Sequence, residues 1–236
     1  APDINKIGDR YVLYYSQPGE NNKHAIGVAS GPSPVGPFTD HGKLIGSDEI
    51  GVDISIDQFY IEEDGHKYMF WGSFRGIYAI ELDVAADAVI TPRPETKMLI
   101  AGTAFEGTNI YKRGDWYYLF ASIGDFSGGA DSTYSTVVGR SRSVTGPYVD
   151  RQEHPMTDNG YELILSKNNR FVGCGHNAGL IEDDKGQTWM FYHAYQLGNT
   201  DIGRQGMLDL VQWDDQGWPS IYDGHPSTVF EVPSIR

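Results

Sequence analysis

Three acidic residues stand out in this chain because their sequence neighbours are apolar. Asp57 lies in DISIDQFYI, Glu106 lies in TAFEGTNIY, and Asp3 lies in APDI at the start of the chain. An acid in an apolar segment is costly to bury unless it is paired, hydrogen-bonded or functional. Burial also raises the pKa of a carboxyl group, as a general acid working near neutral pH requires. The residues alone leave two interpretations of Asp57 and Glu106 open: acid–base chemistry, or hydrogen bonding to backbone groups at strand ends.

Four stretches of the chain repeat one pattern, and this pattern predicts the strands that must position the acids. Each stretch opens with Gly, places an aromatic residue at the third or fourth position, and runs through apolar residues to a small one. A turn led by Gly and followed by a short apolar run is typical of a strand buried on both faces. The stretches are GDRYVLYYS (8–16), GHKYMFWGS (65–73), GDWYYLFAS (114–122) and GQTWMFYHA (186–194).

The spacing of these stretches predicts a β-propeller. Their leading glycines are separated by 57, 49 and 72 residues, and repeats of roughly 50 residues are most often propeller blades. A second repeat, Gly-Pro-aromatic at 36–38 and 146–148, marks a turn after a strand. We therefore expect one all-β domain over 1–236, with blades near 3–50, 53–102, 104–165 and 174–232. The Gly- and Ser-rich segment 124–135 is expected to form a long loop at a blade end.

Composition narrows the class of protein further. A chain of 236 residues with 15 Tyr and 29 Gly suits a single all-β domain, and no segment is long and apolar enough to span a bilayer. A net charge of −14 argues against nucleic acid and anionic membranes as partners and is compatible with a secreted or periplasmic protein. The single Cys174 excludes an internal disulfide framework. Because the chain starts at Ala1 without a signal peptide, we expect a processed or truncated chain.

Six motifs, in order along almost the whole chain, resemble glycoside hydrolase family 43. Members of this family are five-bladed β-propellers that cleave arabinose- and xylose-containing polysaccharides with inversion. The run STYSTVVGRSRSVTGPYVD is most similar to the arabinan-cleaving branch. The motifs are APDI (1–4), SIDQ (55–58), FEGTNIYKRGDWYYLFAS (105–122), VGRSRSVTGPYVD (138–150), GCGHNAGLIEDDKGQTWMFYHAY (173–195) and GRQGMLDLVQWDDQGWP (203–219).

The resemblance implies roles for four of the polar residues. Glu106 matches the general acid that protonates the leaving glycosidic oxygen, and Asp57 matches the acid that orients Glu106 and keeps its pKa raised. Arg204 matches an arginine that contacts the sugar in the −1 subsite, whereas by itself it could form a surface ion pair. His176 matches a histidine of the central channel that commonly carries a hydrated Ca²⁺ or Na⁺, although a lone His in a Gly-rich turn is more often structural. No organic cofactor is implied.

Two aromatic residues are candidates for stacking on a sugar ring. Aromatic side chains combine apolar area with a polar edge, which matches the faces of a sugar. Most aromatic residues of a propeller belong to its core, however. We single out Trp71 and Phe105 because they adjoin a Gly-Ser strand end and a motif acid. His193, in FYHAY, has two open interpretations: a hydrogen-bonded core histidine or a sugar contact.

The resemblance departs from the family at the general base. In the family this residue lies on the inner strand of the first blade, before the APD motif, whereas this chain begins at that motif and has four expected blades. Asp3 is the acid of the motif itself, so a structural role at a strand end is favoured over substrate contact. Three explanations stay open: a first blade is missing from this chain, another chain supplies it, or the propeller is reduced. Gln58, where the family usually has Pro, is expected to be a mild change.

The predicted function is that of an inverting hydrolase of arabinose-containing polysaccharide, either an endo-1,5-α-L-arabinanase or an α-L-arabinofuranosidase. The alternatives are a β-xylosidase of the same family and, because the base is absent, a non-catalytic glycan-binding propeller. The expected ligand is an arabinan or arabinoxylan oligosaccharide. An open ring of four blades would expose two sheet edges, which predicts a dimer or a companion fragment carrying the first blade.

Overall fold

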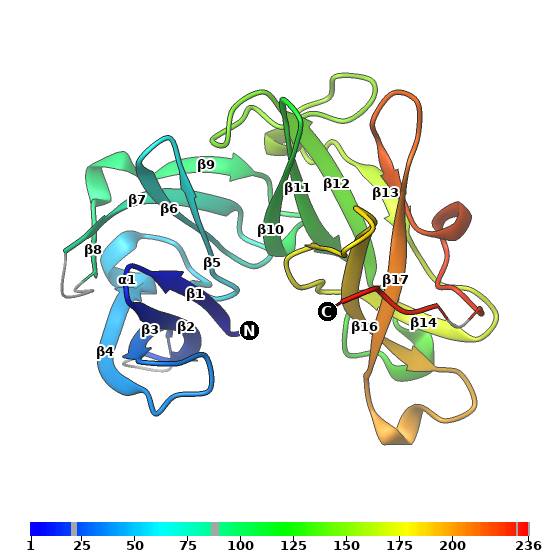
Figure 1. Ribbon diagram of the computed structural model, residues 1–236, viewed down its shortest axis with the longest axis horizontal. Coiled ribbons are helices and arrows are strands. Elements are labelled where there is room, and N and C mark those ends of the chain that lie inside the picture. The colour runs from blue at the N-terminus through cyan, green and yellow to red at the C-terminus, as the bar shows by residue number, and fades with distance from the viewer. Residues whose placement is uncertain (20–22, 86–89, 230, 236) are drawn as a thin grey trace. The chain divides into compact units, whose positions relative to one another are not determined.

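The computed structural model describes residues 1–19, 23–85, 90–229 and 231–235, which form two compact units. The first unit comprises Ala1–Thr108, Ser143–Pro147 and Met156–Asn159, and the second comprises Asn109–Arg142, Tyr148–Pro155 and Gly160–Arg236. Each unit contains two sheets, drawn in blue to teal in the first unit and in green to red in the second (Figure 1). Among the described residues, no helix has the length and apolar character needed to cross a bilayer.

The first sheet of the first unit is a four-stranded antiparallel meander in the order β1-β2-β3-β4. The short helix α1 (Ser47–Ile50) follows it and ends at Gly51, which has a left-handed backbone. The strands are β1 (Asp3–Ile7), β2 (Arg10–Pro18), β3 (His24–Gly31) and β4 (Thr39–Gly46).

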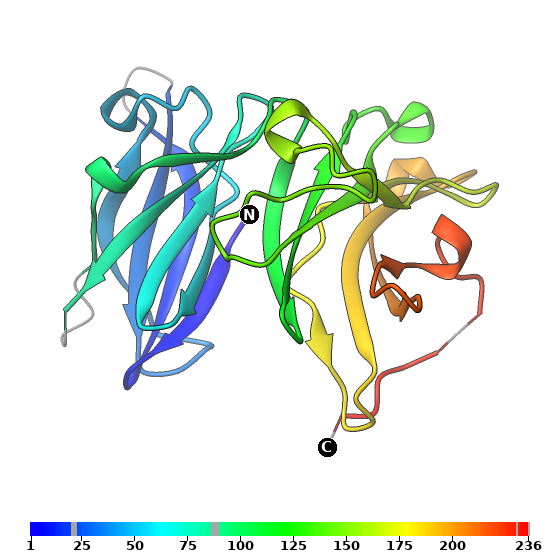
Figure 2. The same cartoon turned by 90° about the horizontal axis from the view of Figure 1, so that it is seen from above.

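The second sheet of the first unit has the order β5-β6-β7-β8, and β9 also pairs with β7. Two short strands share the outer edge of β7: β8 pairs with the end of β7, and β9 pairs with its beginning. The strands are β5 (Phe59–Glu63), β6 (His66–Trp71), β7 (Ile77–Val84), β8 (Ile90–Pro92) and β9 (Met98–Ala101), and the 3₁₀ turns of this unit are η2 (Pro94–Thr96) and η4 (Met156–Asp158). The two sheets lie side by side in both ribbon views (Figures 1 and 2) and share one core that includes Tyr14, Ile26, Met69, Trp71 and Ile80.

The first sheet of the second unit has the order β10-β11-β12-β13. Strand β10 begins in the first unit, which includes its residues up to Thr108, and continues into the second. The connection between β11 and β12 contains η3 (Gly129–Asp131) and corresponds to the long loop expected from the sequence. The strands are β10 (Glu106–Arg113), β11 (Trp116–Ile123), β12 (Ser135–Ser141) and β13 (Glu162–Leu165).

The second sheet of this unit has the order β14-β16-β17-β18, and the short β15 pairs with β16. Its core, which it shares with the preceding sheet, includes Tyr118, Phe120, Cys174, Met190 and Trp218. The strands are β14 (Phe171–Gly175), β15 (Ile181–Glu182), β16 (Thr188–Gln196), β17 (Gln205–Trp213) and β18 (Pro219–Ser220), with 3₁₀ turns at η5 (Thr200–Ile202) and η6 (Tyr222–Gly224).

The four repeated stretches form equivalent strands, namely β2, β6, β11 and β16, one in each sheet. Their leading glycines have φ between +57° and +79°, and a Cβ at any of them would meet no atom within 4 Å. Glycine is therefore favoured there by the left-handed turn rather than by lack of space. Burial on both faces is confirmed for β11 and for the last four residues of β6, whereas β2 and β16 keep partly exposed residues. The single-domain interpretation and the blade limits stay predictions.

The turn between β15 and β16 is organised by the carboxylate of Asp183. Its Oδ1 accepts the backbone N–H groups of Lys185 and Gln187 at 2.9 and 3.0 Å. Its Oδ2 accepts the indole N–H of Trp189 at 3.1 Å and the backbone N–H of Ser234 at 3.0 Å. Burial alone would raise the pKa of Asp183, but these four hydrogen bonds outweigh it and lower the pKa to about 2.

Replacement of this carboxylate should weaken the second unit in a pH-dependent way. Because the folded-state pKa lies below its ordinary value of 3.8, the ionised group stabilises the fold fully above that value and loses this effect as the pH falls toward 2. We expect Asp183→Asn to lower the urea midpoint at pH 7, with a difference from wild type that shrinks as the pH is lowered through this range. Asp184→Asn, at an exposed neighbour, is the matched control. An equal decrease in the urea midpoint at all pH values would contradict the conclusion that the ionised Asp183 carboxylate stabilises the fold.

Candidate active site

Asp57 and Glu106 meet in the first unit although they lie 49 positions apart in the sequence. Asp57 lies in the segment before β5, and Glu106 is the first residue of β10. Their exposed fractions are 7% and 5%, and one carboxylate oxygen of Asp57 lies within 4.8 Å of one of Glu106. The structure thus brings together the two acids that the sequence singled out.

Asp57 is held in an uncommon backbone conformation. Its φ is +58°, a left-handed value that Asp tolerates better than most residues do. Its backbone N–H donates to the Ser16 hydroxyl at 3.2 Å. Burial raises the pKa of the Asp57 carboxyl to about 6, although the backbone N–H of Gly107 donates to the carboxyl and offsets part of this shift. Asp57 therefore holds a proton more readily than an ordinary aspartate does.

Glu106 receives a short hydrogen bond from Ser73, whose Oγ lies 2.6 Å from the Glu106 Oε2 atom. Ser73 follows the end of β6 and is itself buried. Ser73 is the small residue that closes the second repeated stretch, and no role for it was predicted from the sequence.

The closeness of the two acids limits what they can do. Two carboxylates this near cannot both ionise cheaply. A separation below 4.8 Å is also shorter than the roughly 6.5–9.5 Å that admits a water molecule between the acid and base of an inverting glycosidase. The separation therefore does not match that of an acid facing a water-activating base.

Asp3 lies in the same unit and serves as a connection between strands. Its Oδ2 accepts the backbone N–H of Tyr60 at 2.7 Å and the side-chain amide of Asn5 at 2.8 Å. Burial raises its pKa to about 6 despite these hydrogen bonds. This is the structural role at a strand end that the sequence favoured.

The structure does not support sugar stacking by Trp71 or Phe105. Both rings are fully buried, so neither presents a face to a ligand. Trp71 belongs to the core of the first unit, and its indole N–H donates to the Ser55 hydroxyl at 3.1 Å. The Phe105 carbonyl accepts the backbone N–H of Phe74 at 2.8 Å. Proximity to motif residues in the sequence did not reveal on which side of the sheet each ring lies.

In the second unit, His193 joins the two other predicted site residues. Its ring stacks on Tyr134, with centroids 5.5 Å apart and an angle of 7°, and it faces His176 at 6.4 Å. Its Nε2 lies 3.4 Å from the Arg204 Nη1 atom. The Arg204 guanidinium also lies over the Phe126 ring, 5.3 Å from its centroid. His176 and Arg204 therefore belong to one cluster of imidazole and aromatic rings with a guanidinium.

This cluster contains residues that sequence reasoning missed. Phe126, which is 39% exposed, lies in the loop that the sequence marked only by its Gly and Ser content, and Tyr134 follows it. Within the described part of the second unit, no three His, Cys, Asp or Glu side chains converge closely enough to hold a metal ion by themselves.

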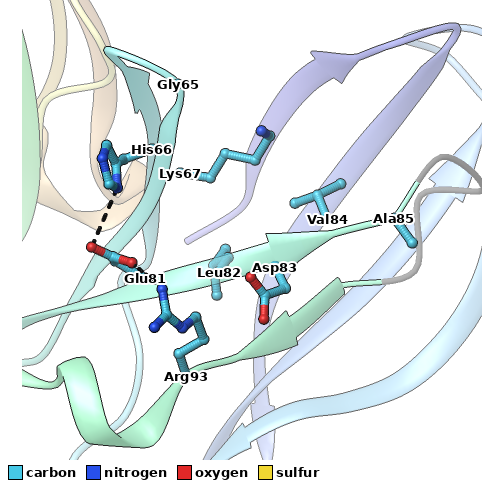
Figure 3. Close-up of a pocket in the computed structure, with 9 residues that line it drawn as sticks. All are labelled: Gly65, His66, Lys67, Glu81, Leu82, Asp83, Val84, Ala85 and Arg93. Atoms are coloured by element: carbon cyan, nitrogen blue, oxygen red, sulfur yellow. Dashed lines mark hydrogen bonds and ion pairs between the residues drawn. The ribbon is translucent and has the colours of Figure 1, made fainter.

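A separate surface pocket of the first unit lies among β6, β7 and β8 and contains none of the predicted site residues (Figure 3). Its most prominent charges neutralise one another, because Glu81 pairs with both His66 and Arg93. We therefore assign no ligand to it. Its lining residues are Gly65, His66, Lys67, Glu81, Leu82, Asp83, Val84, Ala85 and Arg93.

The chain belongs to glycosyl hydrolases family 43, whose family model matches residues 1–219. It is therefore a glycoside hydrolase, and the predicted enzyme class is confirmed. An extracellular exo-α-(1→5)-L-arabinofuranosidase of Cellvibrio japonicus is 35% identical over 94% of this chain and 69% of its own length. An extracellular endo-α-(1→5)-L-arabinanase of Bacillus subtilis is 32% identical over 93% of this chain and 68% of its own length.

Solved structures agree with the sequence relatives. The α-L-arabinanase of Cellvibrio cellulosa complexed with arabinohexaose matches with a TM-score of 0.81 and 32% identity, covering 93% of this chain and 76% of that one. An exo-1,5-α-L-arabinanase from a bovine ruminal metagenomic library matches with a TM-score of 0.80 and 32% identity, covering 94% and 76%. The predicted fold class, an all-β propeller of this family, is confirmed.

The protonation state of His193 offers a direct check of the cluster in the second unit. Burial disfavours its cation, and the nearby Arg204 and His176 add to this effect, so its pKa is lowered from 6.5 to about 4. We expect its ring to stay neutral from about pH 5 to 8 in long-range ¹H–¹⁵N spectra of ¹⁵N-histidine-labelled protein. The His193→Gln variant identifies the signal by its loss. A titration midpoint near 6.5 would show that the ring is solvated and not part of the stack.

Proposed function

We propose that this protein hydrolyses arabinan with inversion, as an endo-1,5-α-L-arabinanase or an α-L-arabinofuranosidase. The observation that carries the proposal is the buried pair of Asp57 and Glu106, because a pure binding protein has no need of two acids within 4.8 Å. The substrate class is supported by the relatives, which are named for cleavage of α-1,5-linked arabinose, and by the arabinohexaose bound to a solved neighbour. Their names favour arabinan over xylose-containing substrates.

In the proposed mechanism Glu106 is the general acid. It donates its proton to the glycosidic oxygen while the bond from that oxygen to the anomeric carbon breaks. Asp57, as a close like-charged neighbour, disfavours ionisation of Glu106 and so keeps the proton in place. A water molecule attacks the opposite face of the sugar and gives its proton to a base. We assign the base to a third carboxylate, since Asp57 is too close to Glu106 and Asp3 is bound to backbone and amide groups.

In the second unit we propose that Arg204 binds sugar hydroxyls through its planar guanidinium. His193 lies against Arg204, and its neutral ring stacked on Tyr134 gives the guanidinium a fixed neighbour. The partly exposed ring of Phe126 takes the stacking role that Trp71 and Phe105 cannot take.

Ca²⁺ takes six to eight oxygen ligands, so the single imidazole nitrogen of His176 would supply one ligand, and other groups or water would supply the rest. Ca²⁺ or Na⁺ near His176 stays a prediction, and no catalytic step is assigned to a metal. We further propose secretion, in keeping with two relatives that are named as extracellular. Association with a second copy or a companion fragment also stays a prediction.

Replacement of the acid should separate chemistry from binding. We expect Glu106→Gln to lower kcat on linear arabinan by about 10²–10⁴-fold, because general acid catalysis is worth that much, while substrate still binds in isothermal titration. The loss should be much smaller on aryl arabinosides, whose leaving groups need little protonation. Arabinan hydrolysis by the variant at the wild-type rate would remove Glu106 from the mechanism. Absence of activity in the wild-type protein, with binding intact, would favour a glycan-binding propeller.

The stereochemistry of the product tests the assignment of Asp57. A separation as short as that of Asp57 and Glu106 is also compatible with a retaining pair, in which Asp57 would be the nucleophile. We expect inversion, so that the sugar first released from an α-L-arabinofuranoside is the β-anomer in ¹H NMR spectra recorded within seconds of mixing. An α-anomer formed first would make Asp57 a nucleophile and overturn the proposed modulating role.

A further inference from the structure

The last residue of the repeated stretch has a recurring contact. Each stretch is nine residues long, and the ninth is Ser16, Ser73, Ser122 or Ala194. The three serines, here called the strand-end serines, lie within two residues of the last residues of β2, β6 and β11. Their hydroxyls contact Asp57, Glu106 and His176, respectively. Each of these partners lies in, or directly beside, a strand of the next sheet along the chain: Asp57 precedes β5, Glu106 begins β10 and His176 follows β14.

The three serine hydroxyls differ in whether they donate or accept the hydrogen bond, but each one contacts a predicted site residue. The Ser16 hydroxyl accepts the backbone N–H of Asp57 at 3.2 Å. The Ser73 hydroxyl donates to the carboxylate of Glu106 at 2.6 Å, and the Ser122 hydroxyl accepts the backbone N–H of His176 at 2.7 Å. Asp57 and His176 both have left-handed φ values, +58° and +50°. Such conformations persist only where the surroundings fix them.

Ser73 is the most firmly held of the three serines. The residue before it, Gly72, donates its N–H to the Ile56 carbonyl at 3.0 Å, and Phe74 after it donates to the Phe105 carbonyl at 2.8 Å. These carbonyls belong to the residues that directly precede Asp57 and Glu106. A Cβ at Gly72 would lie 2.2 Å from the Gly76 carbonyl oxygen, so this turn admits no side chain there. The turn 72–74 thereby ties together the two segments that carry the acids.

Ser16 also accounts for the departure from the family at Gln58. The Ser16 hydroxyl donates to the Gln58 Oε1 atom at 3.2 Å. With its proton directed to Gln58, the hydroxyl turns a lone pair toward the N–H of Asp57. A proline at position 58 would provide no such acceptor.

We infer that the strand-end serines are positioning residues for the active site, and that Ser73 fixes the carboxyl of Glu106 for proton transfer. This inference rests on the proposed function. Because Ser73 donates to Oε2, the acidic proton of Glu106 is directed to Oε1, and the carboxyl plane is fixed relative to the substrate. Ser73 acts through Glu106, so its effect should depend on how much the reaction needs the acid.

The test compares Ser73→Ala with wild type on two substrates. A hydrogen bond to a charged group is worth about 10- to 100-fold, so we expect kcat on linear arabinan to fall by about that factor with KM within about twofold. On an aryl arabinoside with a good leaving group, kcat should change by less than about threefold, because the acid contributes little there. Ser73→Thr, which keeps the hydroxyl, should recover most of the arabinan activity.

Ser30→Ala is the matched control, since it removes an equally buried hydroxyl of the first unit that contacts Arg10 and His41 rather than either acid. Thermal melts of all variants separate loss of folding from loss of positioning. Equal losses on both substrates, or full arabinan activity in Ser73→Ala alongside an inactive Glu106→Gln, would overturn the inference and leave the proposed function intact. An active Glu106→Gln would instead refute the function itself.

Discussion

The candidate site in the first unit depends on the burial of two carboxyl groups within 4.8 Å of each other. Neither desolvation nor mutual repulsion favours this arrangement. Hydrogen bonds offset part of this cost: the Ser73 hydroxyl donates to Glu106, and the backbone N–H of Gly107 donates to Asp57. The remaining cost of burial appears as the raised pKa of Asp57.

The sheets supply these donors through one local device used repeatedly. A left-handed glycine starts each repeated strand, the apolar run anchors the strand in a core, and in three cases a serine completes it. Because the strand is fixed by burial along its length, the hydroxyl at its end has a defined position. A rigidly packed core therefore fixes the positions of the side chains that contact the candidate site, as scaffolds of catalytic groups generally do.

Much of this organisation could be predicted from the sequence, because it is encoded locally. The repeated strands follow from periodicity and glycine, and the two acids follow from the contrast with their neighbours. The roles of Trp71 and Phe105 were misjudged because adjacency in sequence does not say which face of a sheet a ring occupies. Phe126 was overlooked because its loop has no hydrophobic periodicity. Ser73 was overlooked because a serine near a strand end usually marks only the start of a turn. His193 could not be interpreted until its stack with Tyr134 was visible.

The strand-end contacts also bear on how such a chain could have grown by duplication. In three of the four sheets, the strand-end serine contacts a predicted site residue from farther along the chain rather than one of its own sheet. A copied or transplanted blade would therefore bring a hydroxyl to a neighbour that lacks the matching acid or histidine, and would leave its former neighbour unsupported. Ala194, at the corresponding position of the fourth stretch, has no hydroxyl to offer. The repeats are thus alike as folding modules but not interchangeable as parts of the proposed site.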